Sequence, residues 1–205
     1  MKSKKVFALL LCAALAAGVL SGCSGQENPP APSDAPSQSE AGGSPAAGTA
    51  AQLGSLKSFT ATTLDGGSFT QDDIAAKDVT VINFWALTCG PCIAEMPDLA
   101  AFSNALPDNV QVVTVCLDGA GNEAVAQSVL DEAGFGGVTL VSGDGDLAGL
   151  AGNLMYTPTT VFADSEGSLI GDAIIGGQAD LSGTYLEAVN AALRAGGKEE
   201  VSLEA

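Results

Sequence analysis

A pair of cysteines placed directly after a long apolar run constrains the fold of this chain more than any other feature. Residues 79–86, with the sequence VTVINFWA, are almost all apolar or β-branched. Such a run predicts a central strand that is covered on both faces. The motif Cys89-Gly90-Pro91-Cys92 comes next and opens a helical pattern that extends to residue 106. The sequence therefore predicts that both cysteines lie where a buried strand passes into the first turn of a helix.

The rest of the pattern alternates strands with helices and indicates one α/β domain. Two short β-prone runs, at residues 59–64 and 68–70, flank the turn signal Asp65-Gly66-Gly67 and predict an N-terminal β-hairpin. Further strands are expected at residues 110–117, 138–141, 156–162 and 168–175, and further helices at 122–133, 146–154 and 180–194. This order predicts a central mixed sheet flanked by helices and extended by the hairpin.

The position of the motif at a helix N-terminus has a direct chemical consequence. Unpaired backbone N–H groups and the helix macrodipole stabilise an anion there, so Cys89 is expected to be the attacking thiolate. Cys92, one turn deeper, is expected to be the resolving thiol. Pro91 suits the first helical turn, because the N–H that proline lacks is not needed at that position. The pattern therefore favours thiol-disulfide exchange.

Two other interpretations of the motif are half of a zinc site and a structural disulfide. A zinc site needs further Cys or His ligands, and Cys116 is the one other cysteine of the domain. A structural bridge across so small a loop adds little stability, because the entropy that it removes grows with loop length. Cys116 lies in an apolar strand and is expected to be a packed core thiol.

The composition excludes several other classes of function. The chain has no histidine, which removes catalytic triads, Cys-His nucleophile pairs and most zinc or copper sites. Its formal net charge is -17, from 24 acidic and 7 basic residues. Such a surface repels phosphate backbones, so nucleic-acid binding is not expected.

The N-terminus has the pattern of an export signal. Basic residues precede an apolar run at residues 6–20, which is too short for a typical membrane span, and Leu20-Ser21-Gly22-Cys23 resembles a bacterial lipobox. That resemblance implies a signal peptide over residues 1–22, lipidation of Cys23 and location on the outer face of the cytoplasmic membrane. The alternative is an uncleaved signal anchor.

The organisation expected after the signal peptide is a tether, one domain and a tail. Residues 23–52 are rich in Gly, Ser, Pro and Ala with almost no large apolar side chain, which predicts a disordered tether. The domain is predicted over residues 53–195. A polar flexible tail is predicted over residues 196–205.

The motif and its surroundings resemble the TlpA/ResA type of thioredoxin-like oxidoreductase. The similarity rests on NFWALTCGPC at residues 83–92, on Glu95 and Pro97, and on the hairpin. It implies a thioredoxin-like fold and a cis-proline loop at Thr157-Pro158 that lies against the cysteines. It further implies a substrate-binding surface formed by Trp85, Thr88, Gly90, Pro91, Thr157 and Pro158.

Two positions depart from cytosolic thioredoxins. Thr88 replaces the tryptophan that usually precedes the first cysteine, and Asn83 replaces a buried aspartate. An amide cannot accept the proton of the resolving thiol, so another base is needed. Glu95 is the candidate, because it follows Cys92 by one helical turn and ResA-type proteins carry glutamate there. The alternative is that Glu95 only complements the helix N-terminus.

These observations predict a membrane-anchored thiol-disulfide oxidoreductase that reduces disulfides of exported proteins, for cytochrome c maturation or oxidative repair. A transmembrane thiol donor is expected to recharge it, and no cofactor is expected beyond the redox-active Cys89–Cys92 disulfide. Two alternatives remain open at this point. One is a peroxiredoxin-like peroxidase, and the other is a non-enzymatic lipoprotein that binds copper or thiols.

Overall fold

The structure is a computed structural model that describes residues 49–203. The predicted signal peptide, the lipidation site Cys23 and most of the predicted tether lie outside the described residues. Within the described part, no helix combines the length and the hydropathy that a membrane span requires.

A seven-stranded mixed sheet forms the centre of the domain, as predicted, in the order β2-β1-β5-β4-β3-β6-β7. The three strands β3, β4 and β5 run parallel to one another. The other pairings are antiparallel: β6 with β3 and β7 with β6 on one side, and β1 with β5 and β2 with β1 on the other. The strands are β1 Thr60–Thr63, β2 Ser68–Thr70, β3 Val79–Trp85, β4 Val110–Cys116, β5 Val138–Gly143, β6 Thr159–Asp164 and β7 Leu169–Ile175.

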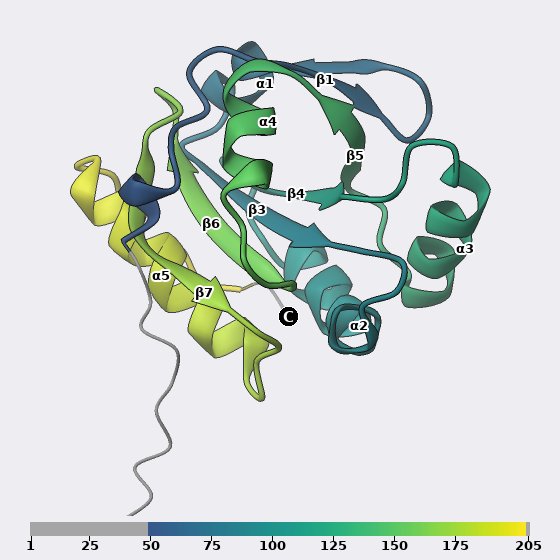
Figure 1. The fold of residues 1–205 in the computed structure, drawn as a ribbon. Coiled ribbons are helices and arrows are strands. Elements are labelled where there is room, and N and C mark those ends of the chain that lie inside the picture. Colours follow the sequence, from purple (N-terminus) through teal and green to yellow (C-terminus); the bar gives the residue numbers. More distant parts are fainter. Residues whose placement is uncertain (1–48, 204–205) are drawn as a thin grey trace, which may run out of the picture. The chain divides into compact units, whose positions relative to one another are not determined.

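Helices cover both faces of the sheet (Figure 1). They are α1 Gln71–Ala75, α2 Gly90–Asn104, α3 Glu123–Ala133, α4 Gly145–Gly152 and α5 Leu181–Ala195, with a short 3-10 turn, η1, at Ala50–Gln52. Alternate residues of β3 divide between the two cores. Val81 and Trp85 pack with α2, α3 and α5, whereas Ile82 and Phe84 pack with α1, α4 and the hairpin. The period of two places Asn83 on the α2 face, which matters for the site.

Residues 196–203, which the sequence predicted to belong to a flexible tail, pack against the domain in the structure. Val201 and Leu203 pack against the α5 side of the core. The Asn190 side chain donates to the carbonyl of Val201 at 3.0 Å and accepts its N–H at 2.8 Å. Lys198 Nζ lies 2.8 Å from Asp78 Oδ1. Two apolar residues, one amide on α5 and one ion pair thus attach this polar segment to the domain.

The last residues of the predicted tether also contact the domain. Thr49 forms an antiparallel bridge with Asp172 of β7, and Ala50 is fully buried. The small side chain of Ala50 fits where the chain passes close to the edge of the sheet. A segment with few large apolar residues can therefore still pack against the domain. The short helix α1 was also missed, although Thr70 and Asp73 form a capping box there.

Candidate active site

Cys89 and Cys92 form a disulfide at the start of α2, with an S–S distance of 1.99 Å and a Cα–Cα distance of 5.3 Å. Cys89 is the N-cap residue, and its sulfur accepts a hydrogen bond from the backbone N–H of Cys92 at 3.2 Å. Cys92 is completely buried, whereas Cys89 is partly exposed. The predicted position of the motif is therefore confirmed, and Cys89 is the sulfur that a partner can reach.

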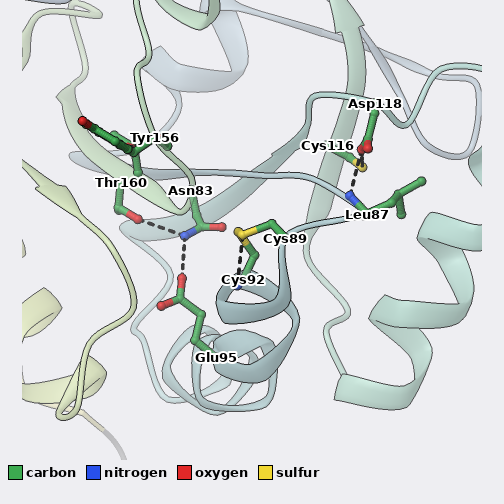
Figure 2. Close-up of a disulfide and its surroundings, with 10 residues drawn as sticks. Asn83, Leu87, Cys89, Cys92, Glu95, Cys116, Asp118, Tyr156 and Thr160 are labelled. Carbon is green, nitrogen blue, oxygen red and sulfur yellow. Dashed lines mark hydrogen bonds between the residues drawn. A yellow bond between two sulfur atoms is a disulfide. The ribbon is translucent and has the colours of Figure 1, made fainter.

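Glu95 and Asn83 lie together on the α2 face of β3. Asn83 Nδ2 donates to Glu95 Oε1 at 3.2 Å, and both side chains are buried (Figure 2). Burial raises the pKa of the Glu95 carboxyl, and the hydrogen bond from Asn83 opposes this shift only in part. A buried carboxyl with a raised pKa binds a proton more readily than an exposed one, which is the property that a proton acceptor near a thiol requires.

The second carboxylate oxygen of Glu95 faces the loop that follows β7. Oε2 is buried and has no hydrogen-bond partner among the described residues. A Cβ added at Gly177 would lie 3.5 Å from this oxygen and 4.0 Å from Cβ of Pro91. The carboxyl group therefore sits between the start of α2 and the loop after β7, where the backbone of Gln178 also acts to lower its pKa.

Thr160 and Tyr185 extend this network, and sequence reasoning missed both. Asn83 Nδ2 also donates to Thr160 Oγ1 at 2.9 Å, and Thr160 Oγ1 lies 2.7 Å from the hydroxyl of Tyr185 on α5. Burial, and then the charge of Glu95, raises the pKa of Tyr185 to about 12, so its hydroxyl stays protonated. The available signal was a polar pair, Thr159 and Thr160, inside an otherwise buried strand.

The predicted cis-proline loop is present. The Thr157–Pro158 peptide bond is cis, and the carbonyl of Pro158 accepts the N–H of Gly176 at 2.8 Å. Pro158 directly precedes β6. The first residue of β6, Thr159, pairs with Phe84 at the end of β3. The loop therefore lies at the same end of the sheet as the disulfide. The predicted strand over residues 156–162 starts later, at Thr159, because this loop occupies its first positions.

The six residues expected to bind substrate differ in accessibility. Thr88, Gly90 and Pro91 are exposed and Thr157 is partly exposed, whereas Pro158 is buried. Trp85 is 0% exposed and packs in the core beneath the motif. Its side chain offers no surface to a substrate, so we correct the expectation that Trp85 contacts one. An aromatic residue at the end of a fully buried strand is more simply interpreted as a core residue that packs beneath the following loop.

Asp118 supports the loop between β3 and the motif, and sequence reasoning missed it too. Its Oδ1 accepts the backbone N–H of Leu87 at 2.8 Å, and Cys116 Sγ lies 3.6 Å from the same oxygen (Figure 2). Burial, followed by the Asp118 charge, raises the pKa of the Cys116 thiol to about 12. Cys116 is therefore a buried, protonated thiol, as expected for a core residue.

The fold and the dithiol together define the class of protein: it is a thioredoxin-fold thiol-disulfide oxidoreductase. The family model described as Redoxin matches residues 46–175, which is more than half of the chain, and the chain belongs to that family. No curated protein matches the chain.

Solved structures of bacterial redox proteins are similar to this chain. That of dsbF from Mycobacterium tuberculosis is 25% identical, covers 67% of this chain and 96% of its own, and has a TM-score of 0.55. A secreted disulfide oxidoreductase of Mycobacterium tuberculosis, homologous to E. coli DsbE, is 27% identical, covers 62% and 93%, and has a TM-score of 0.50. A putative thioredoxin from Neisseria meningitidis is 29% identical, covers 67% and 88%, and has a TM-score of 0.54.

Proposed function

We propose that this chain reduces disulfides of exported proteins while a lipid on Cys23 holds it at the outer face of the cytoplasmic membrane. The observation that carries the proposal is the arrangement of one reachable sulfur, Cys89, above one buried sulfur, Cys92, with the buried Glu95 carboxyl on the same helix. The lipobox-like Leu20-Ser21-Gly22-Cys23 supports the location. So does the similarity to a secreted disulfide oxidoreductase.

The reaction begins with the reduced dithiol. The Cys89 thiolate attacks one sulfur of a substrate disulfide, the Cys89–substrate bond forms, the substrate disulfide breaks, and the departing sulfur leaves as a thiolate. Cys92 then attacks Cys89 Sγ, which forms the Cys89–Cys92 disulfide and releases the second substrate sulfur. Two electrons pass from this chain to the substrate, and a membrane thiol donor restores the dithiol by the same exchange.

Glu95 serves this cycle as the proton acceptor for Cys92. The resolving thiol must lose its proton before it attacks, and it is completely buried away from water. Asn83 has no basic group, and no histidine exists in the chain. Glu95 is the buried carboxyl one turn along α2, and its raised pKa matches a group that takes up the proton and later returns it.

The direction of the reaction is tested by the reduction potential of the full chain, measured by equilibration with glutathione redox buffers. A Gly-Pro dithiol of the thioredoxin kind is expected near the thioredoxin value of about -270 mV, which makes it a reductant in an oxidising compartment. A potential near that of DsbA, about -120 mV, would identify an oxidant and overturn the reductant proposal.

Two further measurements test the location and the kind of substrate. Membrane fractionation of cells that express the chain is expected to place it with the membrane, and Cys23→Ser is expected to release it. Turnover of hydrogen peroxide faster than that of a protein disulfide would favour the peroxidase. Tight binding of copper by the reduced chain, without disulfide exchange, would favour the metal-binding lipoprotein.

A further inference from the structure

The large hydrophobic side chains that remain exposed gather at the end of the sheet that carries the disulfide. Five such residues occur in the described part of the chain: Ile93, Leu117, Val125, Met155 and Tyr156. Soluble domains expose single apolar residues everywhere, so the number itself is ordinary. Their common location is what calls for an explanation.

Three of the five lie at the starts or ends of elements that meet beside the motif. Ile93 is in the first turn of α2, where its N–H bonds to the carbonyl of Cys89. Leu117 follows β4, and its N–H bonds to the carbonyl of Trp85 at 2.9 Å. Val125 is in the first turn of α3, which starts just after the loop that carries Asp118.

The other two exposed residues precede the cis-proline loop. Met155 is 82% exposed and Tyr156 is 59% exposed, and both come directly before Thr157 and Pro158. This loop leads into Thr159, which pairs with Phe84 near the end of β3. The apolar residues therefore lie on two sides of the disulfide, on the α2–β4–α3 side and on the cis-proline side.

Positive charges lie at the opposite end of β3. The chain has seven Lys and Arg residues, of which three fall in the first five positions, so the described part contains four: Lys57, Lys77, Arg194 and Lys198. Lys77 precedes β3 and Lys198 pairs with Asp78, while Arg194 is in the last turn of α5. Lys57 follows Leu56, whose N–H bonds to Gly167 in the turn between β6 and β7.

The charged side chains at the disulfide end of the described part are all carboxylates. Asp118 follows β4, Glu123 begins α3 and Asp180 caps α5, in addition to the buried Glu95. The four cations therefore offer these groups no local neutralisation. The negative potential at the disulfide attracts a positively charged partner and repels an anionic one.

We propose that the disulfide end of the domain docks a polypeptide segment in which the cystine is flanked by apolar and basic side chains. The apolar side chains of the partner would contact the five exposed hydrophobic residues, chiefly Met155 and Tyr156. Its basic side chains would pair with Asp118, Glu123 and Asp180. This inference rests on the proposed function, because it names the kind of disulfide that the dithiol reduces. A second copy of the chain is a poor occupant, since it brings the same acidic surface and a net charge of -17.

The test uses the reduced full chain and three synthetic peptides, each with one intramolecular disulfide. In the first peptide Leu and Lys flank the cysteines, in the second Glu replaces Lys, and in the third Ser replaces Leu. We expect kcat/KM to be at least about tenfold higher for the first peptide than for the second at low salt, with the difference shrinking as salt is added. Equal rates for these two peptides at every salt concentration would overturn the role of charge.

Variants locate the charge effect on the protein. Glu123→Gln combined with Asp180→Asn removes two charges at the disulfide end and keeps the oxygen atoms that accept the N–H groups of Gly121 and Gly183. We expect this pair to reduce the preference for Lys over Glu by several-fold. The matched control, Glu132→Gln with Glu199→Gln, changes the net charge equally at exposed positions elsewhere. An equal loss of preference in the control would show that net charge, and not the docking surface, sets the selectivity.

The apolar contact is tested by Met155→Ser combined with Tyr156→Ser. We expect the preference for the Leu peptide over the Ser peptide to fall by about tenfold, since burying one large apolar side chain is worth about that much. An unchanged preference would overturn the apolar part of the proposal. A concentration-dependent dimer that buries these residues would overturn it in favour of a second copy.

A small neutral disulfide, 2-hydroxyethyl disulfide, distinguishes failure of the docking inference from failure of the proposed function. If the reduced chain reduces this compound but does not distinguish the peptides, the docking inference fails and the proposed function stands. If it reduces neither the compound nor any peptide, the proposed function itself fails.

Discussion

The ends of the two neighbouring strands β3 and β4 carry cysteines with opposite properties. The strands run parallel, and Trp85 pairs with Cys116 in their register. The chain leaves β3, turns, and presents Cys89 at the N-terminus of α2, where a backbone N–H contacts its sulfur. Cys116 ends β4 inside the core, beside the carboxylate of Asp118, with its thiol pKa raised to about 12. Two sulfurs at the same end of the sheet therefore differ in reactivity: Cys89 is placed to react as a thiolate, and Cys116 stays protonated.

The comparison shows that the local environment, and not the residue type, selects the reactive thiol. At Cys89 the nearest polar partner is a backbone donor, which favours a thiolate. At Cys116 the nearest polar partner is a carboxylate, which disfavours one. Asp118 connects the two sites, because the oxygen beside Cys116 also holds the N–H of Leu87 in the loop before Cys89.

The largest expected effect comes from the motif cysteines. Cys89→Ser is expected to abolish disulfide reduction, because no other cysteine sulfur of the described part is both accessible, at least in part, and at a helix N-terminus. Cys92→Ser leaves the attacking sulfur without a resolving partner and is expected to accumulate mixed disulfides at Cys89. These adducts are measured by non-reducing electrophoresis and mass spectrometry. Adducts at Cys116 in the Cys92→Ser variant would contradict the division between the two sites.

The next effect in size is expected at Glu95. Glu95→Gln keeps an oxygen for the Asn83 hydrogen bond but cannot take a proton from Cys92, so resolution of a preformed mixed disulfide should slow by about a hundredfold. The attack by Cys89 should change little, which stopped-flow measurements of the two steps can separate. Glu132→Gln on the exposed end of α3 is the matched control. Equal slowing of both steps would indicate that Glu95 acts only through the helix N-terminus.

Glu95→Gln also predicts a pH dependence of stability. The pKa of Glu95 is raised in the folded chain above its ordinary value of 4.5, so the folded state binds the proton more tightly than the unfolded state does. The stability that this proton contributes is complete below pH 4.5 and is lost as pH rises through the folded pKa. The Gln variant lacks this loss, so its stability relative to the wild type should rise with pH above 4.5 in urea unfolding. A pH-independent difference would contradict the raised pKa.

Much of the fold was predictable because its strands and helices have strong periodic patterns. The apolar run at residues 79–86 and the Asp65-Gly66-Gly67 turn predicted β3 and the hairpin within a residue or two. The ends of the domain were not predictable in the same way. Ala50, Val201 and Leu203 stabilise the termini by packing on surfaces that only the folded sheet and α5 create.

The site residues likewise differ in how far the sequence could predict them. Cys89, Cys92 and Glu95 are close in sequence, so their spacing on one helix could be read directly. Thr160 and Tyr185 join Asn83 from β6 and α5, 77 residues away for Thr160, and no local spacing indicates such a contact. Burial of Trp85 was indicated by its place in the apolar run at residues 79–86, but its position beside the motif favoured a binding surface in the prediction.

A smaller effect is expected from Asp118, which links the two cysteine sites. Asp118→Ala removes the acceptor of the Leu87 N–H and should lower kcat/KM for reduction of the neutral 2-hydroxyethyl disulfide by about tenfold through a less well positioned loop. It should also make Cys116 easier to alkylate, because the carboxylate contributes to the raised pKa. Asp118→Asn retains an acceptor oxygen and removes the charge. We therefore expect Asn to restore turnover of the neutral 2-hydroxyethyl disulfide while Cys116 stays more reactive than in the wild type. An Asn variant that did not restore this turnover, or in which Cys116 was as unreactive as in the wild type, would contradict the two separate roles.

The smallest effect on activity is expected at Cys116. A thiol pKa of about 12 leaves roughly one molecule in ten thousand as thiolate at pH 8, against about a quarter for an unperturbed thiol of pKa about 8.5. Iodoacetamide should therefore label Cys116 in the oxidised folded chain more than about a thousandfold slower than in the chain unfolded in guanidinium, with mass spectrometry as the measurement. Cys116→Ala should change turnover by less than about twofold, because the polar contact of its sulfur is with Asp118 and the thiol stays protonated. Rapid labelling of the folded chain, or loss of turnover in a stably folded Cys116→Ala variant, would mean that the buried end of β4 takes part in the redox chemistry and that the contrast with Cys89 does not hold.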